Sequence, residues 1–101
     1  MHTILWEFEA REEKKHDFIR AYGSDGDWAM LFRRGNGYKG TELLRSTNKP
    51  NVFVTIDRWA NAEDFENFRK QFDKGYCALD ARFSALTLNE KKLGSFESED
   101  C

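Results

Sequence analysis

The chain has 101 residues, which is enough for one hydrophobic core and too short for a second, so we expect a single domain over residues 1–101. Its formal net charge is −2 and its basic residues are scattered, which argues against the basic stripe through which proteins bind nucleic acid. No apolar run approaches the roughly 20 residues of a membrane span, and the N-terminus lacks the regions of a signal peptide. We therefore expect a cytoplasmic protein.

The first predicted strand spans residues 3–10, where large apolar and polar side chains alternate with the period of a half-buried strand. One face carries the larger apolar residues, Ile4, Trp6, Phe8 and Ala10. Between Glu12 and Tyr22 the spacing of apolar residues changes to that of a helix. Gly23 follows as a typical helix stop.

The middle of the chain predicts a hairpin. Trp28 to Phe32 suit a short helical turn, and Tyr38 lies in the glycine-rich connection that follows it. A second strand is expected over residues 41–46, a compact turn over 48–51 and a third strand over 52–59.

Two helices are expected next. Asn61 is a good N-cap, and the following phenylalanines recur at helical spacing as far as Phe72. Gly75 is expected to break this helix, and a further helix would run from Tyr76 to Leu86. A short closing strand is expected over residues 93–96.

This order of elements, β-α-β-β-α-α-(β), predicts an α+β protein with a ferredoxin-like βαββαβ fold and helices on one face of an antiparallel sheet. The third strand is apolar on both faces, because Val54 and Ile56 alternate with Phe53 and Trp59. Helices on one side can cover only one of these faces. We therefore expect a homodimer in which a second copy covers the other face.

Nearly the whole chain resembles the antibiotic biosynthesis monooxygenase-like domains of the dimeric α/β-barrel superfamily. The residues that carry the resemblance are Ala21-Tyr22-Gly23, Gly26, Trp28, Leu31-Phe32, Gly37-Tyr38, Gly40-Thr41-Glu42-Leu43-Leu44, Thr55-Ile56-Asp57-Arg58-Trp59, Tyr76, Leu79-Asp80, Leu86-Thr87, Glu90, Leu93-Gly94 and Phe96. The resemblance implies two protomers whose sheets meet in a barrel, each with a pocket between its own sheet and helices. It also implies an aromatic polyketide-like, quinol or haem ligand, and oxygenation without metal or flavin.

Several kinds of site lack their usual residues. Haem would need a histidine facing the pocket, and the chain has only His2 and His16, neither of them in the segment 62–86. These two histidines show no metal-ligand spacing. Cys77 has no identifiable catalytic partner, and we expect Cys77 and Cys101 to remain reduced rather than to form a disulfide. We therefore expect no metal site and no cofactor.

Oxygenation without a cofactor remains, and it needs an apolar pocket, a base and groups that stabilise an anion. Asp57 and Tyr38 are the candidate catalytic residues, and the candidate substrate-binding walls are Trp28, Phe32, Tyr38, Trp59 and Tyr76. Each of these residues also has a structural interpretation, as core packing or as a hydrogen-bond acceptor. Arg58 is a candidate anion partner, but a regular strand places it on the opposite face from Asp57.

Two functions are therefore expected from the sequence. The first is a domain with a pocket for a small aromatic or quinone-like molecule that acts as a cofactor-independent monooxygenase. The alternative is a non-catalytic small-ligand-binding or stress-associated protein on the same fold.

Overall fold

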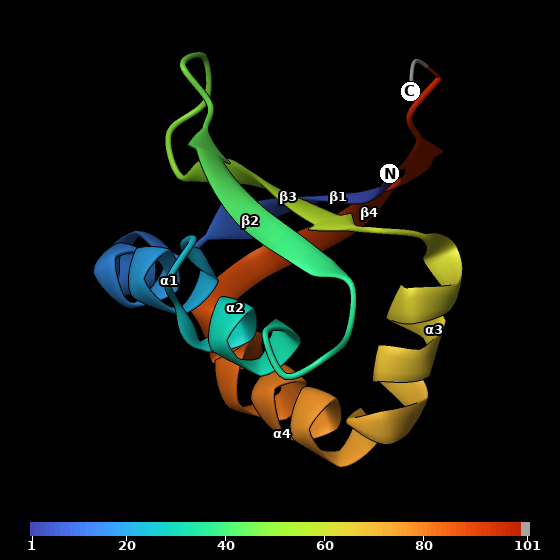
Figure 1. The fold of residues 1–101 in the computed structure, drawn as a ribbon. Coiled ribbons are helices and arrows are strands. Elements are labelled where there is room, and N and C mark those ends of the chain that lie inside the picture. Colours follow the sequence, from blue (N-terminus) through green and yellow to red (C-terminus); the bar gives the residue numbers. More distant parts are fainter. Residues whose placement is uncertain (100–101) are drawn as a thin grey trace.

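A computed structural model describes residues 1–99 and shows a four-stranded antiparallel sheet with all four α-helices on one face (Figure 1). The elements in chain order are β1 (His2–Ala10), a 3₁₀ turn (Glu12–Lys14), α1 (Lys15–Tyr22), α2 (Asp27–Phe32), β2 (Tyr38–Arg45), β3 (Val52–Trp59), α3 (Ala62–Gln71), α4 (Asp73–Phe83), a second 3₁₀ turn (Ser84–Leu86) and β4 (Thr87–Glu97). The predicted α+β, ferredoxin-like fold is confirmed. Cys101 lies outside the described residues.

The strands are ordered β2-β3-β1-β4, so the two central strands are β3 and β1. The hairpin of β2 and β3 places Thr41 opposite Asp57 and Leu43 opposite Thr55. On the other side of β3, Asp57 lies opposite Ile4 of β1. Side chains directly opposite one another point to the same face, so the register decides which residues share the helix side of the sheet.

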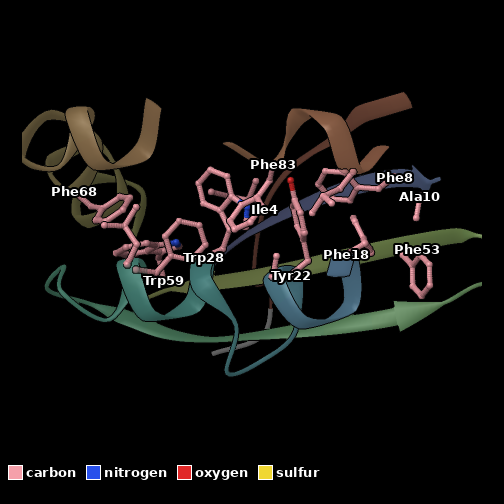
Figure 2. Packing of buried hydrophobic residues seen from close by; sticks show 14 residues of the cluster. Ile4, Phe8, Ala10, Phe18, Tyr22, Trp28, Phe53, Trp59, Phe68 and Phe83 are labelled. Carbon is pink, nitrogen blue, oxygen red and sulfur yellow. The ribbon is translucent and has the colours of Figure 1, made fainter. Parts of the chain in front are cut away.

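The inner face of the sheet packs against the helices through aromatic side chains. Phe53 and Trp59 of β3 are 2% and 0% exposed, and Phe18 of α1 is 0% exposed. Figure 2 shows these rings filling the space between sheet and helices together with Tyr22 and Trp28. Aromatic side chains bury a large area each, so a few of them supply most of the core of so small a domain.

The outer face of the sheet carries apolar side chains that no described helix covers. Leu5 of β1 lies opposite Ile56 of β3, and Val54 lies opposite Leu44 of β2. Leu44 is 44% exposed, and Phe96 of β4, opposite Thr3, is 51% exposed. The sequence prediction that both faces of the sheet are apolar is therefore confirmed for β3.

Three element boundaries differ from the sequence prediction. The break between the last two helices falls at Phe72, while Gly75 lies inside α4. A Cβ atom at Gly75 would lie 3.2 Å from a methyl group of Leu31, so glycine permits α4 to approach α2 closely here. The closing strand is much longer than predicted, and Tyr38 opens β2 instead of lying in the connection before it.

The predicted N-cap of α3 is confirmed, because the Asn61 side chain accepts a hydrogen bond from the backbone N–H of Asp64 over 2.8 Å. Within residues 1–99, no helix has both the length and the apolar character needed to cross a membrane.

Candidate functional site

A cavity of about 60 Å³ lies between the inner face of the sheet and the helices. This volume is several times the roughly 10–15 Å³ that a single water molecule requires. Its walls are mainly aromatic and come from every strand and from three of the helices: Trp6, Phe8, Tyr22, Trp28, Phe32, Thr41, Thr55, Asp57, Tyr76, Asp80 and Glu90. An apolar cavity with a few convergent polar groups is the usual form of a small-molecule site.

Asp57 supplies a carboxyl group from the central strand β3 to this cavity. Burial at this enclosed position raises the pKa of Asp57 from 3.8 to about 6, and a hydrogen bond from Thr41 opposes part of the rise. A carboxyl group with such a pKa is ionised in most molecules at neutral pH and is a stronger base than an exposed carboxylate.

A chain of hydroxyl groups leads away from Asp57. Thr41 Oγ1 donates to Asp57 Oδ1 over 2.6 Å. Because a threonine hydroxyl has one proton, the 2.5 Å contact between Thr41 and Tyr38 must have the Tyr38 hydroxyl as donor. Thr41 and Tyr38 also line a shallow hollow on the surface of the protein, together with Asp25 and Arg33. The chain therefore connects the cavity with solvent.

Phenol groups and acidic side chains surround the other end of the cavity. Burial raises the pKa of Tyr22 to about 12; the Trp28 indole opposes this rise, whereas the negative charges of Glu90 and Asp80 add to it. Burial likewise raises the pKa of Tyr76, an effect that the Arg69 guanidinium, 3.6 Å above the ring centroid, partly offsets. Asp80 and Glu90 belong to the lining and are exposed to solvent.

The structure brings together some of the site residues expected from the sequence and separates others. Trp28, Phe32, Tyr76 and Asp57 line the cavity. Trp59 is fully buried beside Phe32 and is not part of the lining, and Tyr38 contributes through its hydroxyl group and not through its ring.

Arg58 lies on the outer face of the sheet, as the strand period predicted. Its guanidinium donates to Glu42 over 2.9 Å, so it cannot act on an anion in the cavity of its own chain. Within residues 1–99, no three histidine, cysteine, aspartate or glutamate side chains are grouped so that they could hold a metal ion. Cys77 is exposed and unpaired with any other described cysteine.

Comparison of the sequence with protein families gives one match. The profile described as antibiotic biosynthesis monooxygenase matches residues 1–72, which include β1 to α3. The chain belongs to this family. No curated protein sequence matches it.

Several solved structures share the fold of this chain. A mutant of SnoaB, a cofactor-independent oxygenase from Streptomyces nogalater, is 23% identical, with 99% of this chain and 94% of that chain covered and a TM-score of 0.73. A protein from Deinococcus radiodurans that carries the family's name is 16% identical, with 100% and 95% covered and a TM-score of 0.76. PA3566 from Pseudomonas aeruginosa is 15% identical, with 96% and 92% covered and a TM-score of 0.68. At these identities the likeness establishes the fold.

The sequence analysis missed seven residues of the lining: Trp6, Phe8, Tyr22, Thr41, Thr55, Asp80 and Glu90. The position of Thr41 could have been predicted from the hairpin. Ser46 and Val52 pair at its closed end, and Thr41 and Asp57 each lie five residues from that pair, so they stand opposite one another. Asp80 and Glu90 carry no such signal, since their place depends on how α4 and β4 pack.

Proposed function

We propose that this member of the antibiotic biosynthesis monooxygenase family oxygenates a small aromatic or quinone-like molecule without a metal or organic cofactor, with Asp57 as the base. The observation that carries the proposal is the carboxyl group of Asp57 in an aromatic-lined cavity, with a pKa raised to about 6. A base with a pKa near the working pH combines the correct ionisation state with enough basicity to take a proton.

The reaction suited to this site begins at an acidic C–H group next to a carbonyl on an aromatic ring system. Asp57 takes one proton, and the resulting carbanion gives one electron to O₂. The substrate radical and superoxide then join through a new C–O bond, and the peroxide takes up the proton held by Asp57. Loss of water leaves a carbonyl, so that CH₂ and O₂ become C=O and H₂O. Dioxygen is the oxidant, and no further reductant is needed.

The surrounding residues have separate roles in this proposal. Trp28, Phe32 and Tyr76 form the walls that hold the planar substrate. Tyr38 and Thr41 stabilise the Asp57 carboxylate through the hydroxyl chain and offer a route by which its proton exchanges with solvent. Trp59 does not contact the cavity but supports its wall, because its ring packs against Phe32.

Oxygen uptake with a panel of anthrones and hydroquinones tests the proposal. We expect kcat/KM to rise with pH through about 6, as Asp57 ionises, and to fall at least about 100-fold in Asp57→Asn, the usual contribution of a general base. Thr41→Val should move the rise to higher pH, because its hydrogen bond lowers the pKa of Asp57. Asp17→Asn, an exposed change on α1, should have no effect. Saturable binding without oxygen uptake would instead identify a non-catalytic ligand-binding protein.

We also propose that the protein is a homodimer joined through the outer face of the sheet. Leu5, Leu44, Val54, Ile56 and Phe96 lie on this face, away from all four helices. A contiguous apolar patch of this kind is a feature of protein interfaces and is rare on monomers. An identical face on a second copy would cover it symmetrically.

Light scattering coupled to size-exclusion chromatography measures the molar mass in solution. We expect twice the 11.9 kDa of the chain, and a monomer for Ile56→Glu. Ile19→Glu is the matched control, because Ile19 is 41% exposed on α1, on the opposite side of the molecule. A monomeric wild-type protein at high concentration would refute the dimer.

A further inference from the structure

The polar groups of the cavity are strongly biased toward negative charge. Asp57, Asp80 and Glu90 contribute three carboxyl groups, whereas no lysine, arginine or histidine of the part of the chain that the structure describes belongs to the lining. Arg69 stacks on the Tyr76 ring but does not reach the lining. Because Asp80 and Glu90 are exposed, water and salt screen part of their charge, but the set still attracts cations and repels anions at low salt.

The aromatic walls favour the same kind of ligand. Trp28 and Tyr76 meet edge to face with ring centroids 5.0 Å apart, and both line the cavity. Tyr22 and Trp6 lie among the remaining walls. Aromatic faces attract ammonium groups, and aromatic walls combined with carboxylates are a common way for proteins to recognise them.

An unpaired donor on the wall indicates the other end of the ligand. Trp28 is 8% exposed, and its indole N–H makes no well-formed hydrogen bond within the described residues, although it lies close enough to the Tyr22 oxygen to offset part of the rise in the pKa of that phenol. A buried donor without a partner is unfavourable, so an acceptor on a bound molecule would satisfy it. A carbonyl or phenol oxygen is such an acceptor.

The charge balance also constrains the proposed reaction. An anion formed by proton loss in this cavity would stand beside Asp80 and Glu90 without a protein cation among the lining residues. A substrate that carries its own ammonium group near the reacting ring would supply the missing positive charge, whereas an acid group would add to the repulsion.

We infer that the cavity selects aromatic molecules with an amine side chain and an oxygen acceptor on the ring, and that Asp80 and Glu90 are the residues that determine this specificity. The inference rests on the proposed function, because it concerns the same cavity. It assigns to these two exposed carboxylates the recognition of the ammonium group and to the Trp28 N–H the recognition of the ring oxygen.

Three hydroquinones that differ only in their side chain test the inference: 2,5-dihydroxyphenethylamine, 2-methylhydroquinone and 2,5-dihydroxyphenylacetate. Calorimetric titrations under anaerobic conditions at pH 7.5 and low salt measure binding without turnover. We expect the amine to bind about ten-fold more tightly than the methyl compound and the acid about ten-fold more weakly, as expected for charges a few ångströms apart near a protein surface. This spread should shrink in 0.5 M NaCl, because salt screens exposed charges.

In the double variant Asp80→Asn/Glu90→Gln, the ratio of the affinities for the amine and the acid should fall at least about ten-fold. The affinity for the methyl compound should stay within about two-fold of its wild-type value. Glu66→Gln, on the exposed side of α3, is the control for a change in net charge alone. Binding of the methyl compound with no preference among charges, or a preference that survives the double variant, would overturn this inference and leave the proposed function standing. Failure of all three compounds to bind would refute the aromatic cavity itself.

Discussion

Replacing Asp57 by asparagine separates the stability of the fold from the chemistry of the site. Asparagine has nearly the same shape and can still accept the hydrogen bond from Thr41. It removes the ionisable carboxyl group, whose ionised form is destabilised by burial at neutral pH. We expect Asp57→Asn to lose activity. We also expect its stability relative to the wild type to increase as the pH rises, because the stability of the wild type falls.

The expected magnitude follows from the pKa of Asp57. In the native state its pKa is raised from 3.8 to about 6, so between these values the folded protein holds more protons than the unfolded chain. Stability therefore falls as pH rises from about 4 to about 6, and the loss is complete above about pH 7. A pKa change of this size corresponds to about 3 kcal/mol in the free energy of unfolding.

Urea denaturation of the wild type and of Asp57→Asn, at one protein concentration and at pH values from 4 to 8, measures this directly. The difference between the two unfolding free energies removes the contributions of all other titrating groups. We expect it to rise by about 3 kcal/mol in favour of the variant between pH 4 and pH 8. Asp17→Asn, at an exposed position, should give a difference that stays flat.

A flat difference for Asp57→Asn would refute the reasoning, because it would show that the carboxyl group titrates as in the unfolded chain. The proposal that Asp57 is a base tuned by burial would then fail as well. A difference that rises in the opposite sense would indicate a carboxylate stabilised by the protein, with a lowered pKa.

Three further predictions concern the scaffold, and urea denaturation at pH 7 checks each of them. Gly75→Val should destabilise the protein by about 1–3 kcal/mol, because the added side chain presses on Leu31; no loss would show that α4 can move away. Asn61→Ala should cost about 1 kcal/mol through loss of the N-cap of α3, and Asn61→Asp should restore it; failure of the aspartate to do so would contradict a capping role. In the monomeric variant Ile56→Glu, the further change Glu42→Ala should alter the stability by less than about 1 kcal/mol, because the ion pair of Glu42 with Arg58 is then on the surface; a larger loss would contradict a surface pair.

The strands and the first helix could be predicted because each follows a simple period. The alternation from Ile4 to Ala10 and from Val52 to Trp59 marks strands packed on one face, and both are found. The last strand was underestimated because it has few buried residues: most of its side chains are exposed and many are charged, so no alternation is visible in the sequence. Its length is set by pairing with β1, which local sequence does not record.

The last two helices show a different limit of sequence reasoning. Gly75 was expected to end a helix because glycine is a poor helix former. The structure uses it for the close approach of α4 to Leu31, and the chain turns at Phe72 instead. A preference of one residue was thus overridden by a contact between two helices, which the sequence does not display.

The candidate site was only partly accessible to prediction for the same reason. Asp57 and the aromatic residues Trp28, Phe32 and Tyr76 could be proposed from their residue types and from the family resemblance. The hydroxyl of Tyr38 reaches Asp57 only because Thr41 stands opposite Asp57 in the hairpin, and this requires the register.

The match to the family profile ends at residue 72, between the two halves of the proposed site. Asp57 and its hydroxyl partners lie within the matched segment, whereas Tyr76, Asp80 and Glu90 lie beyond it on α4 and β4. The proposed base and the proposed specificity residues are thus carried by separate stretches of chain. If the proposals hold, substitutions in α4 and β4 would change which compounds are accepted and leave the proposed base in place.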